Sequence, residues 1–370
     1  MAGAIPPGTD LTRTALGRNP DGSDPNFENP PTLAAVTYGV TCTMMVLTSG
    51  VVVLRILSAI KKERSIKIDD YCCVLALLLT TAYGILIMLM NRTARHSWDT
   101  PVSAIDESWL KKNAALCLLY GPAMFFAKAA ICTLYLRIFK TVQWMKWCAW
   151  GALVVLGCIF WAMVPIYAVY SFPYGDEEWN LNLALKTGRM DRLTIGICAV
   201  NVASDLFLLV IPLPIIIKLN LSFQKRIGLA AVFMTGIIAT ATTALGLYFR
   251  ISMWQSKSDI DRGDATWVAA ALYITVVVEL YATITVSCVP GCVSSWRNII
   301  RETTVVTTLR SMINSSKASL RSKEASHHAK SLSIRSEEAD ISHKDEYELQ
   351  NPHYRETGII KTIKIQQTEV

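Results

Sequence analysis

Residues 266–290 read TWVAAALYITVVVELYATITVSCVP, a run of 25 residues in which Glu279 is the one charged side chain. A transmembrane α-helix needs about 20 consecutive, mostly apolar residues, so this stretch is long enough to cross a bilayer. Six earlier runs have the same character, at 33–57, 71–90, 113–136, 147–170, 193–217 and 227–251. Together they predict an all-α membrane protein built as a receptor-like bundle of seven transmembrane helices over residues 33–297.

The composition agrees with a chain that lives largely in lipid. Of the 370 residues, 52% are hydrophobic and 18% are charged, whereas an average soluble domain carries about 25% charged residues. A soluble enzyme is therefore excluded, and the lipid bilayer is the expected partner. The net charge of +7 comes from basic residues at helix ends and in the tail, where anionic lipid accounts for them. A nucleic-acid partner is therefore not expected. A metal site is not expected either, since no Cys or His pair has zinc-type spacing.

The two ends of the chain differ from the middle. Residues 1–32 lack the basic-then-apolar pattern of a signal peptide and hold six prolines, so we expect an extracellular, disordered lead. Residues 298–314 space their apolar side chains like an amphipathic helix lying on the inner membrane surface. From 315 to 370 the chain is rich in Ser, Lys and Glu, which predicts a disordered cytoplasmic tail.

Basic residues set the expected orientation. The loops 58–70, 137–146 and 218–226 hold ten Lys and Arg in 32 residues, against nine in 55 residues for the loops on the other side. The denser side faces the cytoplasm by the positive-inside rule, which places the N-terminus outside, most simply at the plasma membrane. The sequon Asn91-Arg92-Thr93 then faces outside, so Asn91 is a predicted glycosylation site and the protein a glycoprotein.

Three ionisable residues fall deep in the predicted hydrocarbon: Lys128 in the third run, Asp205 in the fifth and Glu279 in the seventh. Each costs on the order of 2.5 to 3.5 kcal/mol at a helix centre on insertion scales, so each is expected to face inward and to have a partner. Asn201 precedes Asp205 by one helical turn, and Thr275, Glu279 and Thr283 also follow a four-residue step. These stripes predict an intramembrane network or ligand pocket formed by Lys128, Asn201, Asp205 and Glu279. A clamp that only holds the helices together fits the same residues.

An ordered set of residues at helix ends then becomes recognisable. The set comprises Arg55; Asp69, Asp70 and Tyr71; Lys128; Leu134 to Phe139 with Tyr135 and Arg137; Asn201, Asp205, Pro212 and Pro214; Phe233, Gly236, Arg250, Glu279 and Pro290. It resembles the fungal rhodopsin-domain family, also called the SAT4 or PTH11-like family. The resemblance implies a fungal source and a heptahelical fold. It also implies kinship with proposed G-protein-coupled receptors and with proteins encoded in secondary-metabolite clusters, and it fixes no ligand or reaction.

The sequence departs from opsins and animal receptors at two informative places. The seventh run contains no lysine, so a retinal Schiff base cannot form there and no cofactor is expected. The third run ends Leu136-Arg137-Ile138 rather than in the Asp-Arg-Tyr of animal receptors. Coupling to a heterotrimeric G protein is therefore an analogy from fold and family.

Two functions follow from these residues. The first is a receptor-like protein that binds a small lipophilic ligand between its helices. The alternative is a membrane-embedded cyclase or isomerase, or an accessory protein, of a fungal secondary-metabolite pathway, with Asp205 or Glu279 as general acid. We favour the non-enzymatic reading. Proton-coupled transport lacks the internal repeat that such a mechanism favours.

Overall fold

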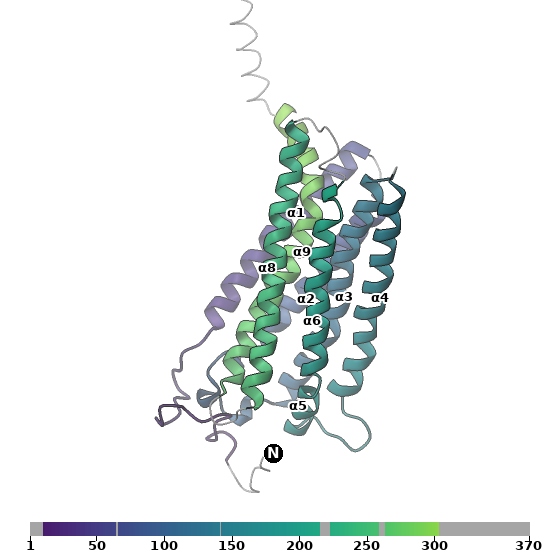
Figure 1. The fold of residues 1–370 in the computed structure, drawn as a ribbon. Coiled ribbons are helices and arrows are strands. Elements are labelled where there is room, and N and C mark those ends of the chain that lie inside the picture. The colour runs from purple at the N-terminus through teal and green to yellow at the C-terminus, as the bar shows by residue number, and fades with distance from the viewer. Residues whose placement is uncertain (1–9, 64–65, 141, 215–222, 259–262, 303–370) are drawn as a thin grey trace, which may run out of the picture. The chain divides into compact units, whose positions relative to one another are not determined.

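A computed structural model describes residues 10–63, 66–140, 142–214, 223–258 and 263–302. Within these ranges, seven helices are long and apolar enough to cross a membrane, which confirms the predicted fold class. They are α1 (Ala34–Glu63), α2 (Ile68–Leu89), α3 (Glu107–Ile138), α4 (Gln143–Ser171), α6 (Asp191–Val210), α8 (Phe223–Ser258) and α9 (Ala265–Glu302). A short helix, α5 (Leu181–Gly188), lies in the connection between α4 and α6 (Figure 1).

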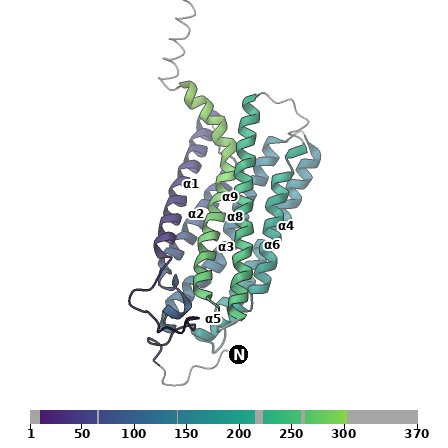
Figure 2. The ribbon, with the colours of Figure 1, turned by 60° about the vertical axis from the view of Figure 1, so that its left-hand side comes forward.

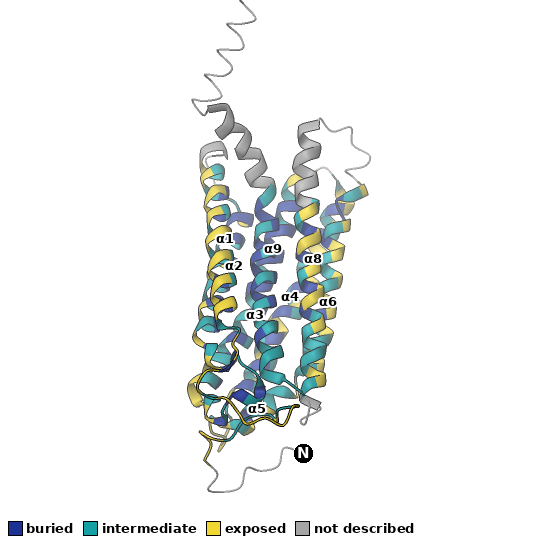
Figure 3. Ribbon diagram, turned by 90° about the vertical axis from the view of Figure 1, so that its left-hand side faces the viewer, coloured by how far each residue is buried: buried dark blue, intermediate teal, exposed yellow. Residues whose placement is uncertain are grey.

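The helices lie side by side (Figure 2), and by burial α3 and α9 are the most enclosed. In the most apolar stretch of each helix, 61% of residues are buried in α3 and 56% in α9, against 17–33% in the other five. The outward faces of the helices remain exposed (Figure 3). They are apolar all the same, as the exposed side chains of Val46, Leu78 and Trp147 show. Apolar side chains exposed to this extent favour contact with lipid over contact with water. A helix can lie in lipid because its backbone hydrogen bonds are made within the helix.

The central packing depends on one close approach of two helices. A Cβ atom added to Gly121 of α3 would lie 2.6 Å from the carbonyl oxygen of Phe160 in α4. Only glycine permits this contact, which lets Met124 and Phe160 join a fully buried apolar cluster with Leu280 of α9. Small residues commonly allow membrane helices to approach closely in this way.

Two expected boundaries need correction. The fifth run was expected to continue to residue 217, but α6 ends at Val210 and a turn at Ile211 and Pro212 follows before helical backbone resumes at Leu213, because Pro212 supplies no N–H to the helical ladder. Residues 215–217 lie outside the described residues. The seventh was expected to stop at Pro290 before a separate helix over 298–314. Instead α9 continues through Pro290 to Glu302, so the start of that expected helix lies within α9. Residues 303–314 and the tail 315–370 lie outside the described residues.

The lead corrects a third expectation. Residues 10–32 were expected to be disordered, yet they are bound to the loop between α2 and α3. Backbone N–H groups of Leu16 and Gly17 donate to the carbonyls of Thr100 and Ser97 at 3.0 and 3.1 Å. Polar composition predicted disorder because a lead of this kind buries little apolar surface. Backbone hydrogen bonds to a neighbouring loop order it instead, and residues 1–9 lie outside the described ranges.

A helix-capping hydrogen bond and an ion pair stabilise the α4–α6 connection, which lies outside the membrane-spanning helices. The side chain of Asn180 accepts a hydrogen bond from the N–H of Asn182 and caps the start of α5. Lys186 Nζ lies 2.7 Å from Glu177 Oε2. The hydrogen bond from Lys186 lowers the pKa of Glu177 below its ordinary value, so this contact is weakened only in acid.

Candidate functional site

Lys128 is the centre of a polar layer across the middle of the bundle. Its side chain is fully buried, and its Nζ lies 2.7 Å from Oδ1 of Asp205 in α6. The same nitrogen donates to the hydroxyl of Ser204 at 2.5 Å and to the carbonyl of Asn201 at 3.1 Å. An ammonium group has three hydrogens to donate, so these contacts use all of them.

Asp205 also connects to α8. Its Oδ2 accepts a hydrogen bond of 2.6 Å from the hydroxyl of Thr243, a fully buried residue. Asp205 therefore links α3, α6 and α8 through one carboxylate. Each oxygen accepts one of these bonds, and a carboxylate has sites for about four in all.

Asn201 joins this layer to α9. Its amide nitrogen donates to Oε1 of Glu279 and lies 3.4 Å from the hydroxyl of Tyr120. Asn201 and Glu279 are 1% and 0% exposed. Within the described part of the chain, Asn201 Oδ1 and Glu279 Oε2 have no hydrogen-bond partner, so the layer keeps spare acceptor atoms in its interior.

Arg250 of α8 also reaches the layer. Its guanidinium lies over the Tyr120 ring, 5.2 Å from the centroid, in a cation–π arrangement. Tyr120 in turn lies 3.4 Å from the amide nitrogen of Asn201. The sequence alone placed Arg250 only through the family resemblance, since it falls at the end of a predicted span.

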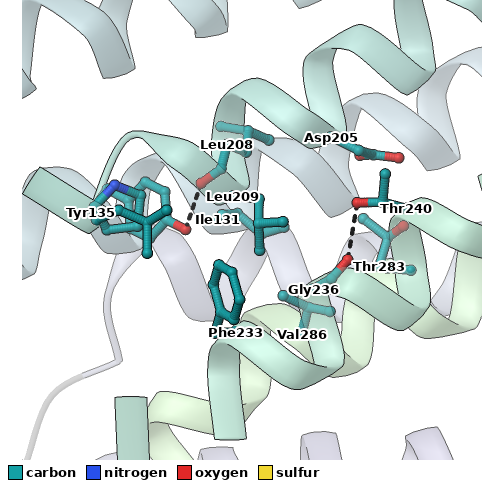
Figure 4. Close-up of a pocket in the computed structure, with 13 residues that line it drawn as sticks. Ile131, Tyr135, Asp205, Leu208, Leu209, Phe233, Gly236, Thr240, Thr283 and Val286 are labelled. Carbon is teal, nitrogen blue, oxygen red and sulfur yellow. Dashed lines mark hydrogen bonds between the residues drawn. The ribbon is translucent and has the colours of Figure 1, made fainter. Parts of the chain in front are cut away.

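A pocket opens next to this layer, between α3, α6, α8 and α9. Its empty volume is about 540 Å³, counting the space at its open mouth. It is lined by Ile131, Tyr135, Asp205, Leu208, Leu209, Pro212, Leu213, Phe233, Gly236, Ala239, Thr240, Thr283 and Val286. Figure 4 shows Asp205, Thr240 and Thr283 together at one side, with the apolar residues around the remainder. The pocket occupies the half of the bundle where α3 and α6 end, away from residues 10–32.

The pocket and the polar layer share some predicted site residues and separate others. Asp205 belongs to both, whereas Lys128, Asn201 and Glu279 do not line the pocket. The two polar stripes were expected to face inward. They meet through the hydrogen bond from Asn201 to Glu279, and each stripe also contributes one residue to the pocket wall, Asp205 from α6 and Thr283 from α9.

Two residues of the family resemblance, Tyr135 and Pro212, line the outer part of the pocket. Tyr135 of α3 donates its hydroxyl hydrogen to the carbonyl of Leu208 at 3.0 Å, which ties α3 to α6. Pro212 lines the pocket just beyond α6, in the turn that separates α6 from the helical backbone of Leu213 and Pro214. The pocket wall therefore continues from the last turns of α6 across this break.

A second buried charge cluster joins α1, α2, α3 and α9 where α1 ends and α2 begins. Arg55 lies 2.5 Å from Asp69 Oδ2 and 2.8 Å from Asp70 Oδ1, and it donates to the carbonyl of Ser287. Arg137 reaches Asp69 at 3.1 Å. Sequence reasoning identified these residues only by resemblance, but the structure shows that they contact one another.

At the N-terminal end of the bundle lies an aromatic stack that sequence reasoning missed. The His96 ring is stacked between Trp98 and Trp267, at centroid distances of 4.6 and 4.1 Å. Its Nδ1 lies 2.5 Å from Asp264 Oδ2, while the other carboxylate oxygen accepts from the N–H of Ser97. This stack fastens the α2–α3 loop to the start of α9.

Asn91, the predicted glycosylation site, begins a 3-10 turn at the end of α2 (Asn91–Thr93). Its side-chain amide donates to the hydroxyl of Tyr38 in α1. Modification of Asn91 stays a prediction.

Seven apolar spans around a buried polar layer define a multi-pass membrane protein of the receptor-like heptahelical class. The chain belongs to the fungal rhodopsin domain family, whose sequence model matches residues 54–298. No solved structure matches the chain.

Three curated proteins of fungi are similar to it. Fugralins biosynthesis cluster protein 2 of Gibberella zeae is 22% identical over 360 residues, which cover 92% of this chain and 84% of that protein. Receptor GIN3 of Arthrobotrys oligospora is 24% identical over 310 residues, 80% of this chain and 71% of the receptor. A SAT4 family membrane protein of Emericella nidulans is 22% identical over 168 residues, 45% and 44% of the two chains.

Proposed function

We propose that this protein is a receptor-like membrane protein that binds a small lipophilic ligand in the pocket, with Asp205 at the polar end of the site. The observation that carries the proposal is the position of Asp205, which holds the buried ion pair with Lys128 and also lines an otherwise largely apolar pocket. Such a combination of apolar wall and few polar groups is typical of small-molecule sites. The similarity to Receptor GIN3 supports the same class.

The pocket's position suggests how binding is transmitted. Its walls include the residues just beyond α6 and the early part of α8, and a ligand that binds one arrangement of these helices better shifts the population toward it. We propose the orientation that the basic loops favour, with the N-terminus outside and the plasma membrane as location. The moving helix ends then face the cytoplasm, where a heterotrimeric G protein is the proposed partner.

Affinity selection tests the proposed site. The full-length protein in lipid nanodiscs is incubated with a lipophilic extract of fungal culture, and retained compounds are identified by mass spectrometry. Gly236→Leu fills the pocket, because a Cβ there already lies 2.6 Å from Leu209 Cδ1. Gly196→Leu is the matched control, since Gly196 is a helical glycine with nothing within 4 Å of an added Cβ.

We expect a compound that wild type and Gly196→Leu retain and that Gly236→Leu loses. Folding of each variant is checked by size exclusion and thermal unfolding. Gly236→Ala gives a milder obstruction if Gly236→Leu folds poorly. Equal retention by folded wild type and pocket-filled protein overturns the proposed site.

The second candidate is catalysis or accessory action in secondary metabolism. It is supported by the similarity to a biosynthesis cluster protein over most of both chains. Asp205 or Glu279 is then the general acid. The geometry favours this candidate less, because Asp205 is ion-paired with Lys128 and Glu279 does not line the pocket. Loss of one product in cells carrying Glu279→Gln, with normal protein levels, favours the enzyme.

A further inference from the structure

We infer that the pocket selects a neutral lipophilic molecule whose polar end is a hydrogen-bond donor, an alcohol or a phenol. This inference rests on the proposed function and adds the chemical class of the ligand. It follows from which donor hydrogens around the pocket already take part in hydrogen bonds within the protein. The side chains at the polar side of the pocket are left with acceptor atoms.

Each hydroxyl group of the pocket wall already donates its hydrogen bond to a backbone carbonyl. Thr240 donates to the carbonyl of Gly236 at 2.9 Å, and Thr283 donates to the carbonyl of Glu279 at 2.8 Å. Tyr135 donates to the carbonyl of Leu208 at 3.0 Å. Figure 4 shows the first and the last of these bonds. Each hydroxyl oxygen keeps lone pairs that can accept.

The ion pair next to the pocket adds another acceptor and no donor. All three hydrogens of Lys128 are taken by Asp205, Ser204 and Asn201. Asp205 accepts from Lys128 and Thr243, which leaves part of the accepting capacity of the carboxylate unused. Its side chain is 9% exposed while that of Lys128 is 0% exposed, so the carboxylate is the member of the pair that a ligand reaches.

This complement of groups discriminates among ligand classes. An ether, ester or ketone brings acceptors to a wall of acceptors, and its oxygen is buried without a partner. A carboxylate adds repulsion from Asp205. An ammonium places an extra charge beside a pair that is already neutral, at a desolvation cost. An alcohol or phenol donates one hydrogen to the wall and needs no countercharge.

Photoaffinity labelling with three matched probes tests this inference. The probes are a dodecanol with a mid-chain diazirine, its methyl ether, and the carboxylic acid of the same chain. Each is used at equal mole fraction in nanodiscs containing the full-length protein, which corrects for different partitioning. Mass spectrometry quantifies labelling of peptides holding residues 131–135, 205–213, 233–240 and 283–286. We expect the alcohol to label these peptides about tenfold more than the ether or the acid, the selectivity of one hydrogen bond to a charged group.

A pair of threonine variants ties the selectivity to the pocket. Thr240→Val removes a pocket acceptor, whereas Thr242→Val removes a neighbouring hydroxyl that donates to Ala239 and does not line the pocket. We expect Thr240→Val to lower labelling by the alcohol and leave the ether unchanged, with no effect of Thr242→Val. Unchanged labelling by the ether also shows that the variant is folded.

The outcomes separate the two proposals. Equal labelling of the pocket peptides by alcohol and ether, or stronger labelling by the acid, overturns the donor inference and leaves the lipophilic site in place. Absence of pocket labelling by all three probes overturns the proposed site and the inference with it.

Discussion

The ammonium of Lys128 lies 2.7 Å from the carboxylate of Asp205, in the middle of the bundle and away from bulk water. This contact joins α3 to α6 beside the pocket, and Asp205 also lines the pocket. A buried ion pair is costly to break, because removing one partner leaves the other charge unpaired, at about 3–5 kcal/mol. Replacing both partners by apolar residues avoids that penalty.

A double-mutant cycle measures the pair. We expect Lys128→Met to lower the free energy of unfolding by about 3 kcal/mol, and Lys128→Met with Asp205→Leu to recover at least about 1 kcal/mol of it. Thermal unfolding of detergent-solubilised protein provides the measurement. Strictly additive losses in the cycle contradict the pairing.

The charge cluster around Asp69 predicts which of its two arginines contributes more to the stability of the protein. Arg55 is 3% exposed and bonds to three residues, whereas Arg137 is 26% exposed at its side chain. Arg55→Met therefore destabilises the protein by about 3 kcal/mol or more, and Arg137→Gln by about 1 kcal/mol or less, as for partly exposed pairs. Unfolding temperatures of the two variants test the rank, and a larger loss for Arg137→Gln contradicts it.

We expect the contact between Asp264 and the aromatic stack to hold the α2–α3 loop and residues 10–32 in place. Asp264→Ala removes the acceptor for His96 and for the N–H of Ser97. The loop then loosens, and with it the lead that bonds to Ser97. Hydrogen–deuterium exchange is expected to speed up at the amides of Ser97, Leu16 and Gly17, with no change in the middle of α6. Unaltered exchange at Gly17 means that the stack does not hold the lead.

Glycosylation tests the orientation. With the N-terminus outside, expression through a secretory pathway gives a glycan on Asn91 that Asn91→Gln removes. Glu28→Thr creates a second sequon with Asn26, on the lead and farther from the membrane, and is expected to add one more glycan. Mass shifts reversed by a glycosidase report both. A Glu28→Thr protein that reaches the membrane without an added glycan contradicts the proposed orientation.

Periodicity and charge burial predicted a large part of this architecture. The seven spans follow from long, mostly apolar runs, and the expectation that Lys128 has a buried partner follows from the cost of an unpaired intramembrane charge. Both are strong, local signals. The sequence leaves open which carboxylate pairs with Lys128. The pairing of Asn201 with Glu279 required only one further step, since both stripes had to face inward.

Other features depend on contacts that no pattern in the chain encodes. The binding of residues 10–32 to the α2–α3 loop uses backbone groups, which every sequence possesses. The stack of His96 on Trp267 joins residues more than 160 positions apart. Pro290 was taken as a stop although a helix can continue through it, at the loss of one backbone hydrogen bond.

Comparative metabolite profiling tests the central claim, that this pocket binds a ligand without converting it. Three fungal strains are compared: one with the wild-type protein, one lacking it, and one carrying Gly236→Leu at normal abundance. If the pocket binds without converting its ligand, no single product disappears with build-up of one precursor, and any broad shift is restored by activating signalling downstream. Loss of one product together with accumulation of one lipophilic precursor, in both altered strains, contradicts it and identifies an enzyme.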